Sequence, residues 1–400
     1  MTHLAPIIPL PTRDTYLETA RAFAAEVARD AVRRDAENHD LRREFIAWGR
    51  TGLLTLTIPK ANGGPGLGYA ELSRMIQIVA EADGALAQTT QTHFGTIDAL
   101  RTFGSPEQRQ WVFDLMLKGA VFGNAQVERG QRGVGLPNVR ILRDGDDYVL
   151  SGQKFYTTGA WNGDWIRVSA TDEEERFTFA IVPRDAAGLS FGHDWDLFGQ
   201  KGTASMSITF DNVRVPADRV LHKHEGAGPF LPLWATFMLV HSAIDIGMGR
   251  AALDAARELI AARGRLAPEA IGHGHASYLD DTHILYRFGE WETRQKAAEL
   301  LQEDGARGLD AVIDSDDAEA IGRATLEIAK AKTFGGEVAL RMASDLFEFG
   351  GAGAANRTLG LDRLWRNLRV HTLHDASWWK YAQIGEHALS GKLPPPLPHQ

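Results

Sequence analysis

VFGNAQVE at residues 121–128, RFTFAIVP at 176–183 and SMSITFDNVRVP at 205–216 are the stretches that decide the fold. Each stretch is short, rich in Val, Ile, Phe and Thr, and set off from its neighbours by turn-forming residues. Three similar segments lie between them: VRILR (139–143), DYVLSG (147–152) and WIRVSA (165–170). Several short strands at this spacing predict an antiparallel sheet or a small barrel.

Helical patterns lie on both sides of this β-region. Residues 14–38 place apolar side chains on one stripe, and Ser105 followed by Pro106 marks another helix start. After the strands, helices are predicted at 232–263, 277–304, 317–347 and 376–390. Strands bracketed by helices, without βαβ alternation, indicate an α+β fold. We expect three domains: N-terminal α-helical (1–118), middle antiparallel β (119–222) and C-terminal helical (223–400).

Composition excludes several classes of protein. The chain has 400 residues, with 43 basic and 52 acidic side chains, so its net charge of −9 argues against nucleic-acid binding. Cysteine is absent, which excludes disulfides and thiolate metal sites. No signal peptide is visible, and the apolar stretch at 229–240 is too short to span a bilayer. These features indicate a cytoplasmic protein that does not bind membranes.

Oligomerisation is predicted from the helix at 232–263. Its apolar side chains lie on several faces, more than one subunit core would need to bury. These side chains are Leu233, Trp234, Phe237, Met238, Leu239, Ile244 and Ile246.

Motif searches leave one histidine pair of interest. Nucleotide-binding, serine-hydrolase and zinc-protease signatures are absent. His371 and His374 lie in RNLRVHTLHDASWWKY beside Asp375, and the i, i+3 spacing predicts that they share one helix face. Proton transfer and a structural role are both open for this pair. No metal site is predicted, because no third ligand can be nominated.

An ordered set of motifs covers nearly the whole chain. These motifs are PKANGGPGLGYAE (59–71), FGSPEQRQ (103–110), NAQVER (124–129), KFYTTGAWNGDW (154–165), GQKGTASMSITFDNVRVP (199–216) and FEFGGAGA (347–354). Together they resemble the acyl-CoA dehydrogenase superfamily. The resemblance implies a C-terminal four-helix bundle, a flavin between that bundle and the β-domain, and a homotetramer or homodimer.

The chain departs from the superfamily pattern at the positions that usually hold the catalytic glutamate. The YEGT-like loop that usually carries the catalytic glutamate is missing, and the alternative helix position holds Arg257. Glu258 is adjacent but points about 100° away. Removal of an α-proton beside a thioester therefore lacks its base. The segments RNLRVHTLHD and HDWDLFGQKGTAS instead resemble the flavin-dependent monooxygenases that include dibenzothiophene monooxygenase.

This branch implies a two-component enzyme that uses O2 and reduced FMN from a partner flavin reductase. A flavin hydroperoxide then oxygenates a small sulfur- or nitrogen-containing substrate. FAD is the alternative cofactor.

The resemblance also assigns site residues. The catalytic set at the reactive edge of the flavin is His93, Thr158 and His374. The residues lining or adjoining the isoalloxazine pocket are Asn124, Thr157, Trp195, His371 and Asp375. Arg263 and Arg265 are expected to bind the flavin phosphate, because two guanidinium groups suit a dianion.

Two other functions compete with this one. The first is an FAD-dependent acyl-CoA dehydrogenase or oxidase with a non-standard base. The second is a non-catalytic relative that acts as a binding or scaffold protein, against which the His93, Thr158 and His374 set argues.

Overall fold

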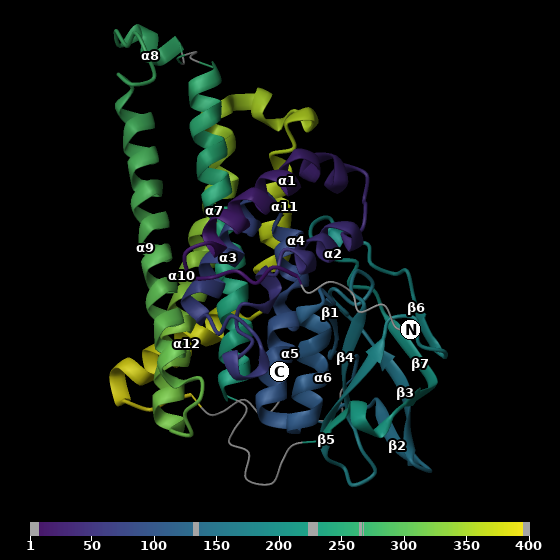
Figure 1. Cartoon of the computed structure of the whole chain (residues 1–400). Coiled ribbons are helices and arrows are strands. Elements are labelled where there is room, and N and C mark those ends of the chain that lie inside the picture. The colour runs from purple at the N-terminus through teal and green to yellow at the C-terminus, as the bar shows by residue number, and fades with distance from the viewer. Residues whose placement is uncertain (1–7, 131–135, 223–230, 264–265, 267, 395–400) are drawn as a thin grey trace.

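The computed structural model describes residues 8–130, 136–222, 231–263, 266 and 268–394. The chain begins with helices that lie, in Figure 1, between the β-strands and the long helices of the C-terminal region. These helices are α1 (Tyr16–Ala36), α2 (Arg42–Arg50), α3 (Tyr69–Ala82), α4 (Gly84–Thr89), α5 (Gln91–Phe103) and α6 (Pro106–Leu117). The predicted start of α6 is confirmed, because the Ser105 hydroxyl accepts a hydrogen bond from the Gln108 N–H. A break between α3 and α4 was not predicted, and there the Asp83 carboxylate caps α4 and pairs with Arg34 at 3.0 Å.

The β-region forms one twisted sheet at the side of these helices (Figure 1). Its strands are β1 (Phe122–Ala125), β2 (Arg140–Asp144), β3 (Asp147–Lys154), β4 (Trp165–Thr171), β5 (Phe177–Pro183), β6 (Leu189–Phe191), β7 (Ile208–Val215) and β8 (Val220–His222). They follow the order β6-β7-β3-β2-β4-β5-β8, with β1 paired to β4. All six predicted strands are present, whereas β6 and β8 were missed.

One feature of the sheet corrects the prediction that it is antiparallel. β1 runs parallel to β4, with Phe122 opposite Trp165 and Asn124 opposite Arg167, and β2 meets β4 in the same sense. The other pairs are antiparallel. The parallel pair arises because the β2–β3 hairpin separates β1 from β4 along the chain, so no tight turn reverses the direction between them.

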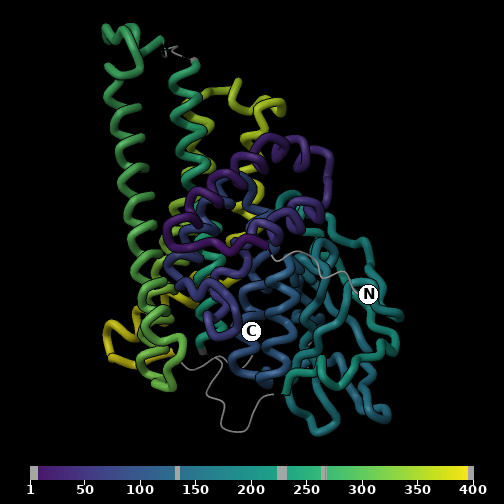
Figure 2. The backbone as a smooth tube through the Cα atoms, in the orientation of Figure 1, coloured from purple at the N-terminus to yellow at the C-terminus, as the bar shows by residue number. Residues whose placement is uncertain are grey.

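Long helices make up the C-terminal region, and Figure 2 follows two of them, α7 and α9, out to the short α8 that lies between them in the chain. The helices are α7 (Leu231–Arg263), α8 (Pro268–Gly272), α9 (Thr282–Val312), α10 (Ala318–Gly350), α11 (Asp362–His371) and α12 (Ser377–Ser390). The four predicted helices are present, and α8 and α11 were not predicted. None of the helices in the described ranges combines the length and apolar character that crossing a bilayer requires.

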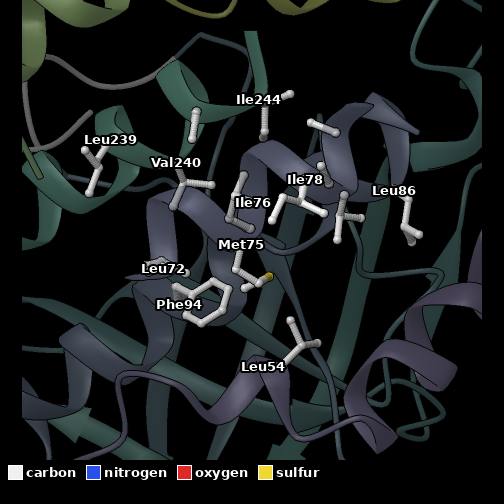
Figure 3. Close-up of a cluster of buried hydrophobic side chains, with 14 of the residues drawn as sticks. Leu54, Leu72, Met75, Ile76, Ile78, Leu86, Phe94, Leu239, Val240 and Ile244 are labelled. Atoms are coloured by element: carbon white, nitrogen blue, oxygen red, sulfur yellow. The ribbon is translucent and has the colours of Figure 1, made fainter. Parts of the chain in front are cut away.

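Burial in the core explains why α7 carries apolar side chains on several of its faces. Side chains from α3, α4, α5 and α7 meet in a buried cluster that includes Ile76, Leu86, Phe94 and Val240 (Figure 3). Of the α7 side chains predicted to face a partner, six are less than 9% exposed within this one subunit, namely Leu233, Phe237, Met238, Leu239, Ile244 and Ile246. The reason given for oligomerisation was therefore wrong, because α3, α5 and α10 already cover this helix.

Candidate active site

The loop that leads into β7 is fastened to α11. The Gln200 N–H donates to Asn367 Oδ1 at 2.7 Å, and the Gln200 amide donates to the Asn367 carbonyl at 3.3 Å. Arg366 donates to the Phe198 carbonyl at 2.7 Å. Gln200 and Ala204 adopt left-handed backbone, with φ of 54° and 47°, which is uncommon away from glycine. The β-domain and the C-terminal helices therefore meet in a closely specified geometry at this loop.

A buried chain of charged and imidazole groups lies behind this junction. Lys332 of α10 contacts Asp245 Oδ2 of α7 at 2.6 Å. Asp245 Oδ1 bonds His371 Nδ1 of α11 at 2.6 Å, and His371 Nε2 lies 2.9 Å from His241 Nδ1 of α7. Each residue is at most 2% exposed. We call this series the imidazole chain.

Electrostatics fixes the direction of the hydrogen bonds along the imidazole chain. Burial would raise the pKa of Asp245, but the charge of Lys332 and the bond to His371 hold it below its usual value. Burial lowers the pKa of His371 in spite of Asp245, and burial next to the basic side chains of His374, His371 and Lys332 keeps the pKa of His241 well below normal. Both imidazoles are therefore neutral at pH 7.

With Asp245 ionised, only one arrangement of protons satisfies the imidazole chain. His371 Nδ1 donates to Asp245, so His371 Nε2 must accept from His241 Nδ1. His241 Nε2 is then an unprotonated acceptor. This atom is buried and has no hydrogen-bond partner. Such an unpaired acceptor is costly unless a ligand or water completes it.

His374 lies beside the free end of the imidazole chain. Its ring packs at a tilt against that of His241, with centroids 3.8 Å apart and an interplanar angle of 35°. Its side chain is 45% exposed, and Nδ1 lies 3.5 Å from Asp375 Oδ1. Burial would raise the pKa of Asp375, but contact with His374 holds it well below the usual range. His374 is thus a solvent-accessible imidazole that packs against the buried imidazole of His241.

The predicted placement of His371 and His374 on one helix face is corrected. α11 ends at His371, and His374 follows in a turn. The two rings are brought together by His241, whose centroid lies 4.9 Å from that of His371.

On the β-domain side, hydroxyl groups form a second chain. Thr203 donates to the Gln200 carbonyl at 2.8 Å, so Ser205 must donate to Thr203 at 2.8 Å. Thr158 must then donate to Ser205, also at 2.8 Å, which leaves Thr158 Oγ1 as an acceptor. Thr157 is buried and donates its hydroxyl to the Met206 carbonyl at 2.5 Å. Thr158 can therefore receive a hydrogen bond from a ligand, whereas Thr157 holds the turn in place.

His93 is fully buried between α5 and β1. Its Nε2 bonds the Leu54 carbonyl at 2.9 Å, and its Nδ1 accepts from the Phe122 N–H at 3.2 Å. Burial lowers the pKa of His93 to about 4. Because both ring nitrogens are engaged by backbone groups, this geometry suits a positioning role better than proton transfer.

Asn124 and Trp195 offer the features that a flat heterocycle needs. The Asn124 N–H donates to the Thr158 carbonyl at 2.9 Å, while its side-chain oxygen is buried without a partner. Trp195 donates to the Gln200 carbonyl at 3.0 Å and lines a cavity of about 250 Å³ together with Met206. An isoalloxazine ring fits this set of groups: the unpaired amide oxygen of Asn124, the free hydroxyl acceptor of Thr158 and the Trp195 indole beside a cavity.

Two predicted residues cannot be placed. Arg265 lies outside the described residues, and so does the side chain of Arg263. Within the described ranges, no group of three or more His, Asp or Glu side chains is arranged to hold a metal ion.

Sequence reasoning missed four residues of this site: Ser205, His241, Asp245 and Lys332. A signal for two of them was present. His241 and Asp245 are four residues apart in the apolar stretch FMLVHSAIDIG, and that spacing places two polar side chains on one face of a buried helix.

Comparisons with known proteins agree with this architecture. Models of the acyl-CoA dehydrogenase N-terminal, middle and C-terminal domains match residues 11–120, 131–213 and 239–378. A probable FMNH2-dependent monooxygenase, SfnC of Pseudomonas putida, is 31% identical over 95% of this chain and 96% of its own length.

Two solved structures extend the similarity to the fold. FMN-bound TdsC of Paenibacillus sp. A11-2, a dibenzothiophene monooxygenase, has a TM-score of 0.89 and 27% identity, covering 96% of this chain and 100% of its own. The methanesulfinate monooxygenase MsuC of Pseudomonas fluorescens has a TM-score of 0.85 and 30% identity, covering 95% and 98%. The resemblance inferred from the motifs is confirmed. The chain belongs to the acyl-CoA dehydrogenase superfamily and is similar to its FMNH2-dependent monooxygenases.

Proposed function

We propose that this protein is a two-component monooxygenase that uses O2 and reduced FMN, supplied by a separate flavin reductase, to oxygenate a small sulfur- or nitrogen-containing compound. The observation that carries the proposal is the exposed His374 ring, whose centroid lies 3.8 Å from that of His241 at the free end of the imidazole chain. The similarity to FMNH2-dependent monooxygenases supports the choice of cofactor.

The flavin would be held from both sides of the domain junction. Asn124 and Thr158 would bond its polar edge, and Trp195 would pack against its ring system. Arg263 and Arg265 keep their predicted role at the phosphate. When bound, reduced FMN reacts with O2 and supplies one oxygen atom to the substrate, while the other leaves as water.

This chain's own residues hold and deliver the proton that the reaction needs. His374 Nε2 makes no hydrogen bond within the described residues, so its exposed ring can take a proton from solvent and deliver it to the departing oxygen. Asp375 beside Nδ1 stabilises the charged ring. His241, neutral and buried, packs against His374 without competing for that proton.

The acyl-CoA dehydrogenase alternative fits less well. Arg257, at the alternative base position, pairs with Asp254 at 2.6 Å and Glu292 at 3.5 Å and is 54% exposed. Asp375 is a carboxylate near His374, but its pKa is held well below normal, so it is a weak base at neutral pH.

Oxygen uptake with enzymatically supplied FMNH2 tests the proposal. The panel is thioethers, sulfones, sulfinates and amines, with catalase present to separate product formation from peroxide release. We expect one panel member to give an oxygenated product with matching O2 consumption. Bleaching of bound FAD by octanoyl-CoA or butyryl-CoA, with no oxygenated product from the panel, would contradict the proposal and favour the dehydrogenase.

A further inference from the structure

A guanidinium group lies buried beside this site without a direct ion pair. Arg167 of β4 is 1% exposed, and the buried carboxylate of Asp98 on α5 acts on its charge from beyond ion-pair distance. Its Nη1 donates to the Gly95 carbonyl at 3.0 Å, whereas Nε and Nη2 have no hydrogen-bond partner. A buried charge normally has a partner, because its desolvation is expensive.

The two unpaired nitrogens share one edge of the guanidinium group. Nε–H and the adjacent Nη2–H point the same way, and this planar edge is the one that binds two oxygens of a carboxylate-like anion together. The faces of the group are covered by the rings of Phe179 at 4.4 Å and Phe237 at 5.5 Å. Burial lowers the pKa of Arg167 to about 9, so the group remains charged at pH 7.

Two other unpaired groups lie on the elements next to Arg167. Asn124 is the register partner of Arg167 on the parallel strand β1, so both side chains leave the same face of the sheet, and its amide oxygen has no partner. The Trp234 indole N–H is also buried and unpaired, and its ring lies 5.4 Å from that of Phe237. Phe237 fits here because a Cβ at Gly95 would lie 1.8 Å from its ring.

We infer that Arg167, with the Trp234 indole N–H, binds the anionic head of the substrate, and that the substrate is therefore a small oxyanion such as a sulfinate or carboxylate. This inference rests on the proposed function and names its substrate class. Charge, the planar edge and the excess of unpaired donors over acceptors all point to an anion. The methanesulfinate monooxygenase among the relatives is named for a substrate of this class.

Calorimetric titration of the FMN-loaded protein tests the inference without turnover. The probes are methanesulfinate and the neutral dimethyl sulfone, which are similar in size. We expect the wild type to bind the sulfinate at least ~10-fold more tightly than the sulfone. Equal affinity for both probes would overturn the inference, and this comparison needs no variant.

Variants locate the effect. Arg167→Gln should weaken sulfinate binding by ~10- to 100-fold, the range for hydrogen bonds to charged groups, and leave the sulfone unchanged. Arg167→Lys, which keeps the charge but loses the planar edge, should fall between the two. Arg140→Gln on β2, which removes a surface pair with Glu175, is the matched control.

Two outcomes would assign Arg167 another role. A change in FMN affinity with unchanged sulfinate affinity would make it a flavin contact. A lower melting temperature with an unchanged ratio of sulfinate to sulfone affinity would make it structural. Oxygenation of neutral thioethers without anion binding would contradict the inference but leave the proposed function standing. Anion binding without oxygenation of any panel member would contradict the proposed function but leave the anion site standing.

Discussion

Asp245→Asn is the sharpest perturbation of the imidazole chain. Asp245 bonds two groups at 2.6 Å, Lys332 and His371, and both of them donate to it. An amide offers one acceptor and one donor, so it cannot satisfy both. If the amide oxygen stays on Lys332, its NH2 faces His371 Nδ1, which must then accept. The His371 ring changes tautomer, its Nε2 donates to His241, and His241 Nε2 becomes a donor.

The cost in stability follows from burial. Lys332 is 2% exposed and Asp245 0%, so Asp245→Asn leaves an ammonium group without its charge partner. Removing one member of a buried ion pair costs about 3–5 kcal/mol. Lys332→Met should cost a similar amount. The double variant removes both charges and should cost less than the sum, with a coupling free energy of about 2 kcal/mol or more.

Two measurements check this reasoning. Urea unfolding of the four proteins gives the coupling free energy, and histidine ¹⁵N shifts report which ring nitrogens carry protons. Product yield with FMNH2 should fall at least ~10-fold in Asp245→Asn, because His241 Nε2, the buried acceptor that a ligand would complete, becomes a donor. Additive stabilities in the double variant, or unchanged histidine tautomers in a folded Asp245→Asn protein, would refute the argument.

Three further predictions concern other parts of the molecule. His374→Ala should lower product formation by ~10²–10⁴-fold and increase peroxide release with little change in melting temperature, because the ring is 45% exposed; normal coupling of O2 use to product would contradict the proton-donor role. Burial raises the pKa of Glu81 from 4.5 to about 7, so the stability that its protonation contributes is full below pH 4.5 and is lost as pH rises through 7. Glu81→Gln should therefore stabilise the protein by up to about 3 kcal/mol at pH 8 and far less at pH 5, and equal gains in thermal melts at both pH values would exclude this. Trp378 and Trp379 of α12 are 67% and 57% exposed and stack on each other, so we expect α12 to lie in the homo-oligomer interface. Light scattering should show a dimer or tetramer that Trp378→Glu weakens, and a monomeric wild type would rule the interface out.

Local signals in the sequence predicted much of the fold. The strands were found because each carries its own β-branched and aromatic residues, and α6 because Ser105 and Pro106 mark its start. α11 was missed because it is only 10 residues long and half of its buried positions are polar. Asn367 and His371 occupy two of its four buried positions, and they are buried for their hydrogen bonds to Gln200 and Asp245.

The site depends on contacts between residues that are distant in sequence. His371 could be singled out from its motif, but its partners Asp245 and His241 lie 126 and 130 residues away, and Lys332 lies 87 residues from Asp245. A neutral imidazole does not reveal which nitrogen carries its proton until its neighbours are known. Here one ionised carboxylate sets that choice for two rings in succession. The chemistry available at His241, the ring that packs against His374, is therefore decided at Asp245, two hydrogen bonds away.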